Sequence, residues 1–241
     1  MSLEIKSLAD SNVRTLSVIY GQSGTGKTYT ISSLKGATLL IDLDYGTACL
    51  PPDFPISIVQ PESLEETLMF LTANDLSAFD NIVIDNLSAL QNLYMSKFKK
   101  PQIQDWGACS KLMLRVIDAL ARITAKGVNV IVLSQEKILN EDNPNMIYYT
   151  LNVMDSVRSY IQARSQIIGH TFYNTSSGYC ISFTPTDHSV TKLSVYGIKV
   201  DSVNSLAEIL DILSSRGSNQ PTTIPVPPDA YVSREGEEDN A

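Results

Sequence analysis

Eight consecutive residues carry the clearest chemistry in the sequence. Residues 21–28, GQSGTGKT, match the pattern GxxxxGK[ST] in full. Glycines permit positive φ angles, so the backbone N–H groups of such a loop can turn toward phosphate oxygens. Lys27 would supply positive charge to the β and γ phosphates, and Thr28 would offer a hydroxyl to Mg²⁺. The pattern therefore predicts a loop that binds ATP with Mg²⁺. The expected nucleotide contacts are Gly21, Gln22, Ser23, Gly24, Thr25, Gly26, Lys27, Thr28 and Tyr29.

A carboxylate suited to the same metal ion ends a later apolar run. The segment FDNIVIDN places Asp85 directly after residues 81–84. In a parallel sheet, ligands bind beyond the carboxyl ends of the strands, which is where Asp85 would lie. We therefore expect Thr28 and Asp85 to hold Mg²⁺. The alternative for Asp85 is a cap on the segment that follows.

Three further polar residues follow apolar runs. Asp42 and Asp44, in IDLDYG, would point to one face if the strand continues. Asp44 is the predicted general base for the water that attacks the γ-phosphate, with Asp42 on the metal side. Gln135, in VIVLSQEK, can donate and accept hydrogen bonds, so it is predicted to sense the γ-phosphate or to orient water. With Lys27, Asp44 and Gln135 form the predicted catalytic set. For the two aspartates the alternative is an acid that merely ends a strand, and for Gln135 it is a solvated glutamine in a loop.

Alternating apolar runs and helical repeats would position these residues. The pattern predicts strands over residues 15–20, 38–43, 56–60, 81–84 and 128–134, and helices over 27–34, 61–73 and 105–125. Strands that alternate with helices favour parallel pairing with right-handed crossovers. Beyond residue 140, segments 146–153, 166–174 and 179–183 resemble β-ribbon, and a last helix is predicted over 205–213. The predicted fold class is α/β, with a mostly parallel central sheet extended by antiparallel strands.

Length and composition favour one main domain. The 241 residues are predicted to form a domain over 1–214 and a flexible acidic tail over 215–241, where Ser, Pro, Thr, Gly and acids dominate. The net charge of −8 argues against a basic coat for nucleic acid, although it does not exclude DNA binding. No stretch is apolar for long enough to span a bilayer, so we expect no membrane association and a cytoplasmic protein.

The cysteines and histidines offer little chemistry by their spacing. Cys49, Cys109 and Cys180 show neither metal-binding nor disulfide spacing, so they are expected to be reduced core residues. His170 and His188 are the only histidines in the sequence. Two histidines alone give no basis for a metal site or a triad, and both are interpreted as ordinary structural or surface residues.

The order and spacing of GQSGTGKT, IDLDYG, FDNIVIDNLSAL and VIVLSQE resemble the RecA-like core. The chain looks most like compact phage-encoded ATPases described as nucleotide-binding or single-strand annealing proteins. The likeness covers residues 14–140, and PQIQDWG at 101–107 is similar to an Asp-aromatic-Gly element of these proteins. The resemblance implies a phage-encoded, Mg²⁺-dependent ATPase that acts in DNA recombination, single-strand annealing or replication. It also implies homo-oligomers with nucleotide between subunits, and single-stranded DNA as a partner.

The resemblance also bears on individual residues. Asp44 stands where RecA-type enzymes usually carry the glutamate that activates water, and Gln135 matches their polar sensor. Many of the phage proteins carry a late basic pair that reaches a neighbour's nucleotide. Lys192 matches one member of that pair, and Arg158 and Arg164 are rival candidates.

Other functions remain open from the sequence. Residues 97–100, KFKK, combine positive charge with an aromatic ring, as single-strand grooves do, although a solvated basic loop is the alternative. A motor or assembly ATPase that handles DNA through another protein would suit the acidic charge better. A nucleotide kinase is less favoured, because the sequence shows no arginine-rich lid after the phosphate loop.

Overall fold

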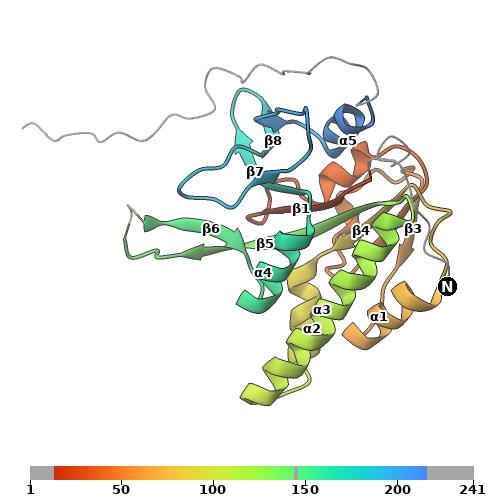
Figure 1. Ribbon diagram of the computed structural model, residues 1–241, viewed down its shortest axis with the longest axis vertical. Coiled ribbons are helices and arrows are strands. Elements are labelled where there is room, and N and C mark those ends of the chain that lie inside the picture. The colour runs from red at the N-terminus through yellow and green to blue at the C-terminus, as the bar shows by residue number, and fades with distance from the viewer. Residues whose placement is uncertain (1–13, 144–145, 216–241) are drawn as a thin grey trace, which may run out of the picture.

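The computed structural model describes residues 14–143 and 146–215 as an α/β fold built on one sheet (Figure 1). Beyond Ser215, the predicted acidic tail lies outside the described residues, as do residues 1–13 of the predicted domain. The strands are β1 (Leu16–Gly21), β2 (Thr38–Asp42), β3 (Ile56–Val59), β4 (Asn81–Asp85), β5 (Asn129–Leu139), β6 (Tyr148–Leu151), β7 (Ile167–Asn174), β8 (Gly178–Ser182), β9 (Lys192–Leu193) and β10 (Ser202–Val203). The helices are α1 (Leu64–Ala73), α2 (Leu87–Met95), α3 (Ile103–Ala125), α4 (Asp155–Arg164) and α5 (Leu206–Ser214), with 3₁₀ turns η2 (Tyr29–Ser33) and η3 (Thr47–Cys49).

The described strands confirm the predicted fold class. The order is β10-β8-β7-β1-β5-β4-β2-β3, and the pairs from β7 through to β3 are parallel. Antiparallel strands extend this sheet, because β8 pairs with β7, β10 with β8, β6 with β5 and β9 with β7. One detail differs from the prediction: β7 was expected in the antiparallel ribbon, but it pairs parallel with β1.

Strand register brings the predicted site residues to one edge. Asp42 at the end of β2 lies opposite Asp85 at the end of β4, and Gly21 at the end of β1 lies opposite Gln135 in β5. Parallel strands end on the same side of the sheet, so their carboxyl ends form the edge from which the phosphate loop leaves.

Two cores cover the two faces of the sheet. Along β5, Val130 and Val132 face the larger core, which α1 to α4 complete, whereas Ile131 and Leu133 face a second core with η2 and α5. Figure 1 shows α1, α2 and α3 gathered on one side of the sheet and α5 on the other. Because both faces are covered, these central strands are apolar runs rather than alternating ones.

The last helix that the structure describes, α5, is capped by the segment after the phosphate loop. The backbone N–H of Leu206 donates to Thr30 Oγ1 at 3.1 Å, and that of Ala207 donates to Ser33 Oγ at 3.2 Å. Within α5, Glu208 N donates to the Ser205 hydroxyl at 3.3 Å. First-turn amides lack helical partners, so the hydroxyls of η2 replace water there.

Several local expectations were wrong. The helix predicted over 27–34 is only the 3₁₀ turn η2, and β5 runs past residue 134 to Leu139, where it forms a projecting hairpin with β6 (Figure 1). Helices α2 and α4 were not predicted. Cys109 and Cys180 are buried, but Cys49 is exposed; all three are free. No helix among residues 14–143 and 146–215 has the length and apolarity needed to cross a bilayer.

Candidate functional site

The phosphate-binding loop connects β1 to η2. Gly24 and Gly26 both have a φ of +81°, a conformation that residues with a Cβ rarely adopt. Gln22, Ser23 and Gly24 are exposed, so the outer part of the loop is open to solvent. The Lys27 side chain turns back into the loop, where its Nζ donates to the carbonyl oxygens of Gly21 at 2.9 Å and Gln22 at 2.6 Å. The loop thus presents solvent-accessible backbone N–H groups and one ammonium group, which fits a polyphosphate chain.

Burial of Lys27 has an electrostatic consequence. Burial lowers the pKa of Lys27, while the negative charges of Asp85, Glu136 and Asp44 act in the opposite direction. These carboxylates therefore lie close enough to stabilise the charged ammonium. A positive charge that is partly desolvated interacts more strongly with an incoming anion than one in bulk water does.

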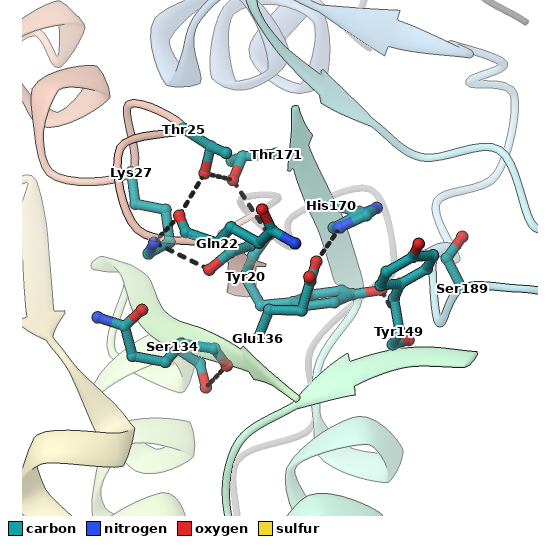
Figure 2. Close-up of polar contacts among 12 residues, drawn as sticks. Tyr20, Gln22, Thr25, Lys27, Ser134, Glu136, Tyr149, His170, Thr171 and Ser189 are labelled. Carbon is teal, nitrogen blue, oxygen red and sulfur yellow. Dashed lines mark hydrogen bonds and ion pairs between the residues drawn. The ribbon is translucent and has the colours of Figure 1, made fainter. Parts of the chain in front are cut away.

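Hydroxyl groups anchor the loop to β7. Thr25 Oγ1 donates to the carbonyl oxygen of Gln22 at 2.7 Å and also lies 2.7 Å from Thr171 Oγ1, an arrangement visible in Figure 2. Thr171 Oγ1 in turn donates to the carbonyl oxygen of Tyr20 at 3.3 Å. At Gly21, an added Cβ would lie 2.8 Å from the Thr171 carbonyl oxygen, so only glycine fits where the loop leaves the strand.

Thr28 and Asp85 meet as the sequence predicts. The Thr28 hydroxyl donates to Asp85 Oδ2 at 2.6 Å, and Asp85 is buried at the end of β4. Burial raises the pKa of Asp85 to about 6, although the hydrogen bond from Thr28 opposes the shift. Residues 14–143 and 146–215 contain no group of three or more His, Cys, Asp or Glu side chains that could enclose a metal ion. Two oxygen ligands fit Mg²⁺, which usually keeps several waters and takes its other ligands from substrate phosphates. When bound, Mg²⁺ would supply charge that neutralises the phosphates.

Strand β2 does not continue from Asp42 to Asp44, which was the condition for both side chains to point to one face. Strand β2 ends at Asp42, which is buried and accepts hydrogen bonds from Gln60 Nε2 at 2.9 Å and from Gly46 N at 3.4 Å. Asp44 lies beyond the strand, is exposed, and accepts a hydrogen bond from Asn86 Nδ2 at 2.9 Å. The negative charges of Asp44 and Asp42 both raise the pKa of Asp85, so each acts on Asp85 through the field at this edge.

Gln135 is held at the same edge by its backbone. Its N–H donates to Ser88 Oγ at 3.1 Å, and its carbonyl oxygen accepts from Asn152 N at 2.8 Å. Strand register places it opposite Gly21, the first residue of the loop. Because β5 continues into the β5–β6 hairpin, Gln135 lies where the phosphate loop and that hairpin meet.

Sequence reasoning missed a buried polar pair next to Gln135. Glu136 Oε2 lies 2.5 Å from His170 Nε2, with side-chain exposures of 3% and 18%. Figure 2 shows the two side chains pointing toward each other, next to the rings of Tyr20 and Tyr149. The His170 ring stacks on Tyr20 at 4.8 Å between centroids and on Tyr149 at 5.7 Å. Glu136 Oε1 is buried without a hydrogen-bond partner among the described residues. His170 is therefore interpreted as a structural residue. Its partner Glu136 directly follows Gln135, so the pair lies next to the candidate site.

The candidates for a finger that reaches a neighbouring subunit make bonds within the chain. Lys192 Nζ donates to the carbonyl oxygens of Gln162 at 3.1 Å and Ser165 at 2.7 Å, at the end of α4. The Arg158 guanidinium donates to two backbone carbonyls and pairs with an aspartate in its own helix. Arg164 pairs with an aspartate of α3 and is 47% exposed, which makes it the most accessible of the three.

Two further sequence elements, KFKK and residues 101–107, lie before and across the start of α3. In KFKK, Lys97 pairs with Glu65 at 2.7 Å and Phe98 packs against the core, whereas Lys99 and Lys100 are exposed. In the element at 101–107, the Asp105 carboxylate accepts from Gln102 N at 2.7 Å and so caps α3. Trp106, the aromatic residue of this element, is 41% exposed.

A parallel α/β sheet whose first strand leads into this glycine loop, with a threonine and a strand-ending aspartate beside it, defines a P-loop ATPase-type domain. A family model described as AAA domain matches residues 15–215, and the chain belongs to this family. The match continues well beyond residue 140, where the resemblance in the motifs ends. Membership indicates a nucleotide-binding ATPase domain, which usually works with Mg²⁺. No curated protein matches the chain.

Proposed function

We propose that the protein binds ATP with Mg²⁺ and hydrolyses its β–γ phosphoanhydride bond. The observation that carries this proposal is the convergence of Lys27, Thr28 and Asp85. The hydroxyl and carboxylate are 2.6 Å apart, and the charge of Asp85 acts on the Lys27 ammonium. The backbone of residues 21–26 would bind the phosphates, Lys27 would neutralise them, and the Thr28 and Asp85 oxygens would hold the metal ion.

Hydrolysis also needs a group that accepts a proton from water. Asp44 is the proposed general base, because it is exposed and oriented by Asn86 at 2.9 Å. Asp42 has its two carboxylate oxygens engaged by Gln60 and Gly46, which supports a positioning role on the metal side. Gln135 is the proposed γ-phosphate sensor, since it lies opposite the start of the loop.

The sharpest test replaces the proposed metal ligand by an isosteric group. Thr28→Val keeps the shape of the side chain and removes its hydroxyl. We expect the variant to lose most of its Mg²⁺-dependent phosphate release from ATP, measured against wild type with Mg²⁺ and with EDTA. Thr72→Val, in α1 and away from the loop, is the matched control and should hydrolyse ATP like wild type. Phosphate release by Thr28→Val at the wild-type rate would contradict the proposed metal site.

We further propose that hydrolysis serves a transaction on single-stranded DNA, of the recombination, annealing or replication type, by self-associated subunits. The motif resemblance supports this, and so does the β5–β6 hairpin, which begins at the proposed sensor. The test is phosphate release with and without single-stranded DNA over a salt series, because phosphate contacts weaken steeply with salt. A salt-sensitive stimulation that is lost in Lys99→Ala/Lys100→Ala would support direct binding. Light scattering with an ATP analogue tests self-association.

A second candidate is a motor or assembly ATPase that handles DNA through another protein. The net charge of −8 favours it, because a negative surface repels the DNA backbone. Phosphate release that is indifferent to DNA at every salt concentration would favour this candidate over the first. Transfer of phosphate from ATP to a nucleoside would instead indicate a kinase.

A further inference from the structure

A cavity of about 370 Å³ lies directly beside the phosphate loop. Its walls come from three parts of the chain: the phosphate loop with η2, the β7–β8 hairpin, and the link from β10 to α5. Small-molecule sites usually have volumes of roughly 300–1,000 Å³. The cavity is therefore large enough for part of a ligand whose remainder extends along the loop.

Two tyrosines form an aromatic wall in this cavity. Tyr29 opens η2 and Tyr179 lies on β8; their ring centroids are 6.2 Å apart, with ring planes inclined by 47°. They are 52% and 42% exposed, so part of each ring remains available for contact. An added Cβ at Gly26 would lie 2.8 Å from Tyr179 Cγ. The Tyr179 ring thus rests against the backbone of the phosphate loop itself.

The rest of the lining is polar but uncharged. It includes the hydroxyls of Ser32, Ser177 and Ser205, and none of the described residues around the cavity is charged. Asn204 Nδ2 donates to the carbonyl oxygens of Ser177 at 2.8 Å and Tyr179 at 3.4 Å, which fixes the hairpin that carries the aromatic wall. Phosphate binding needs cationic groups or a concentration of N–H donors. The cavity instead suits an uncharged ring system with hydroxyl groups.

We propose that this cavity is the nucleoside subsite, with the base stacked on Tyr179 and Tyr29 and the ribose near the serine hydroxyls. The inference rests on the proposed function, because it requires the phosphates of the same ligand to occupy the loop. Aromatic side chains bind bases through their faces and tolerate different bases. Recognition here is therefore by stacking, and purine nucleotides bind more tightly than pyrimidine nucleotides because their rings are larger.

Calorimetric titration with two ligands tests the subsite. With Mg²⁺ present, ATP probes the loop and the cavity together, whereas inorganic tripolyphosphate probes the loop alone. We expect wild type to bind ATP more tightly than tripolyphosphate. Tyr179→Ala should weaken ATP binding by about tenfold or more, in line with base–aromatic stacking of roughly 1–3 kcal/mol, and leave tripolyphosphate binding unchanged. Tyr179→Phe keeps the ring and should bind ATP like wild type.

Tyr196→Ala provides a matched control, because Tyr196 is 88% exposed and does not line the cavity. It should bind both ligands like wild type. Unchanged tripolyphosphate binding by Tyr179→Ala also shows that its loop is still folded. Equal ATP affinity in wild type and Tyr179→Ala, with tripolyphosphate bound by both, overturns the nucleoside subsite and leaves the proposed ATPase standing. Failure of wild type to bind either ligand overturns both proposals.

Discussion

The Glu136 carboxylate and the His170 imidazole join two strands that flank the strand carrying the phosphate loop. Glu136 is on β5 and His170 on β7, with β1 between them. Their side chains are 2.5 Å apart, and the His170 ring stacks on the ring of Tyr20 from β1. A buried polar group costs little only when it is hydrogen-bonded. The pair therefore links β5 to β7 across β1, near the point where the phosphate loop begins.

Removing the imidazole should destabilise this edge. His170→Phe keeps a ring for stacking on Tyr20 but leaves the Glu136 carboxylate without its partner. We expect a fall of about 3 kcal/mol in the unfolding free energy, measured by urea denaturation, because a buried carboxylate then loses its hydrogen bond. His188→Phe alters an exposed histidine and should change stability by less than about 0.5 kcal/mol. If both variants lowered the unfolding free energy by the same amount, the Glu136–His170 pair would make no specific contribution to stability.

Removing the loop ammonium should abolish turnover. Lys27→Ala deletes the charge that the phosphates would meet, so we expect ATP hydrolysis to fall by at least about 100-fold, a usual magnitude for loss of one group that stabilises developing charge. Phosphate release is the measurement. Lys35→Ala, an exposed lysine paired with Asp211 on the surface, should retain wild-type activity. If Lys27→Ala turns over normally, the loop is not the catalytic phosphate site.

Changing the proposed general base should separate binding from turnover. Asp44→Asn keeps a side chain that can bond Asn86 but cannot accept a proton from water. We expect ATP affinity within about twofold of wild type and a kcat lower by roughly 100-fold or more, the usual contribution of general-base catalysis. Calorimetry and single-turnover hydrolysis measure the two effects. Asp53→Asn, an exposed acid outside the site, serves as control. A wild-type kcat for Asp44→Asn would rule out Asp44 as the base.

The Asp85 carboxyl should make stability fall as pH rises in metal-free buffer. Burial raises its pKa to about 6, whereas an unfolded aspartate titrates near about 3.9. The folded chain therefore binds this proton more tightly, and its stability is highest below about pH 4 for this group. Between about pH 4 and pH 6 the unfolding free energy should lose up to about 3 kcal/mol. Asp85→Asn should lack this component. Identical pH dependence of urea unfolding in wild type and variant would disprove it.

The parallel sheet and its loop could be predicted because their signals are local. Five apolar runs became β1 to β5, and a complete glycine motif follows the first. Parallel strands with both faces covered read as continuous apolar segments, so they stand out without further information. The proximity of Thr28 and Asp85 follows from that topology, and their role as metal ligands stays a prediction.

Other parts of the structure depend on contacts that no local pattern encodes. The 27–34 segment contains one Tyr, two Thr and two Ser residues, which form helices poorly, and only the 3₁₀ turn η2 forms there. Helix α4 buries only Val157 and Ile161, so its periodic signal is weak. Glu136 and His170 are 34 positions apart, and only the pairing of β5 and β7 with β1 makes them neighbours. The cavity lined by Tyr29 and Tyr179 likewise forms only where the phosphate loop, the β7–β8 hairpin and the link before α5 come together.

The hydroxyls of Thr30 and Ser33 connect the segment after the phosphate loop to α5, about 175 positions later in the sequence. They are the capping groups of α5, so the last described helix starts on side chains that follow the phosphate loop by only a few residues. Truncating the chain before Ser205 would therefore remove one end of the cavity and leave both hydroxyls without these amide donors. A spectroscopic probe attached to α5 should therefore report ligand occupancy at the phosphate loop, although α5 and the loop are distant in sequence.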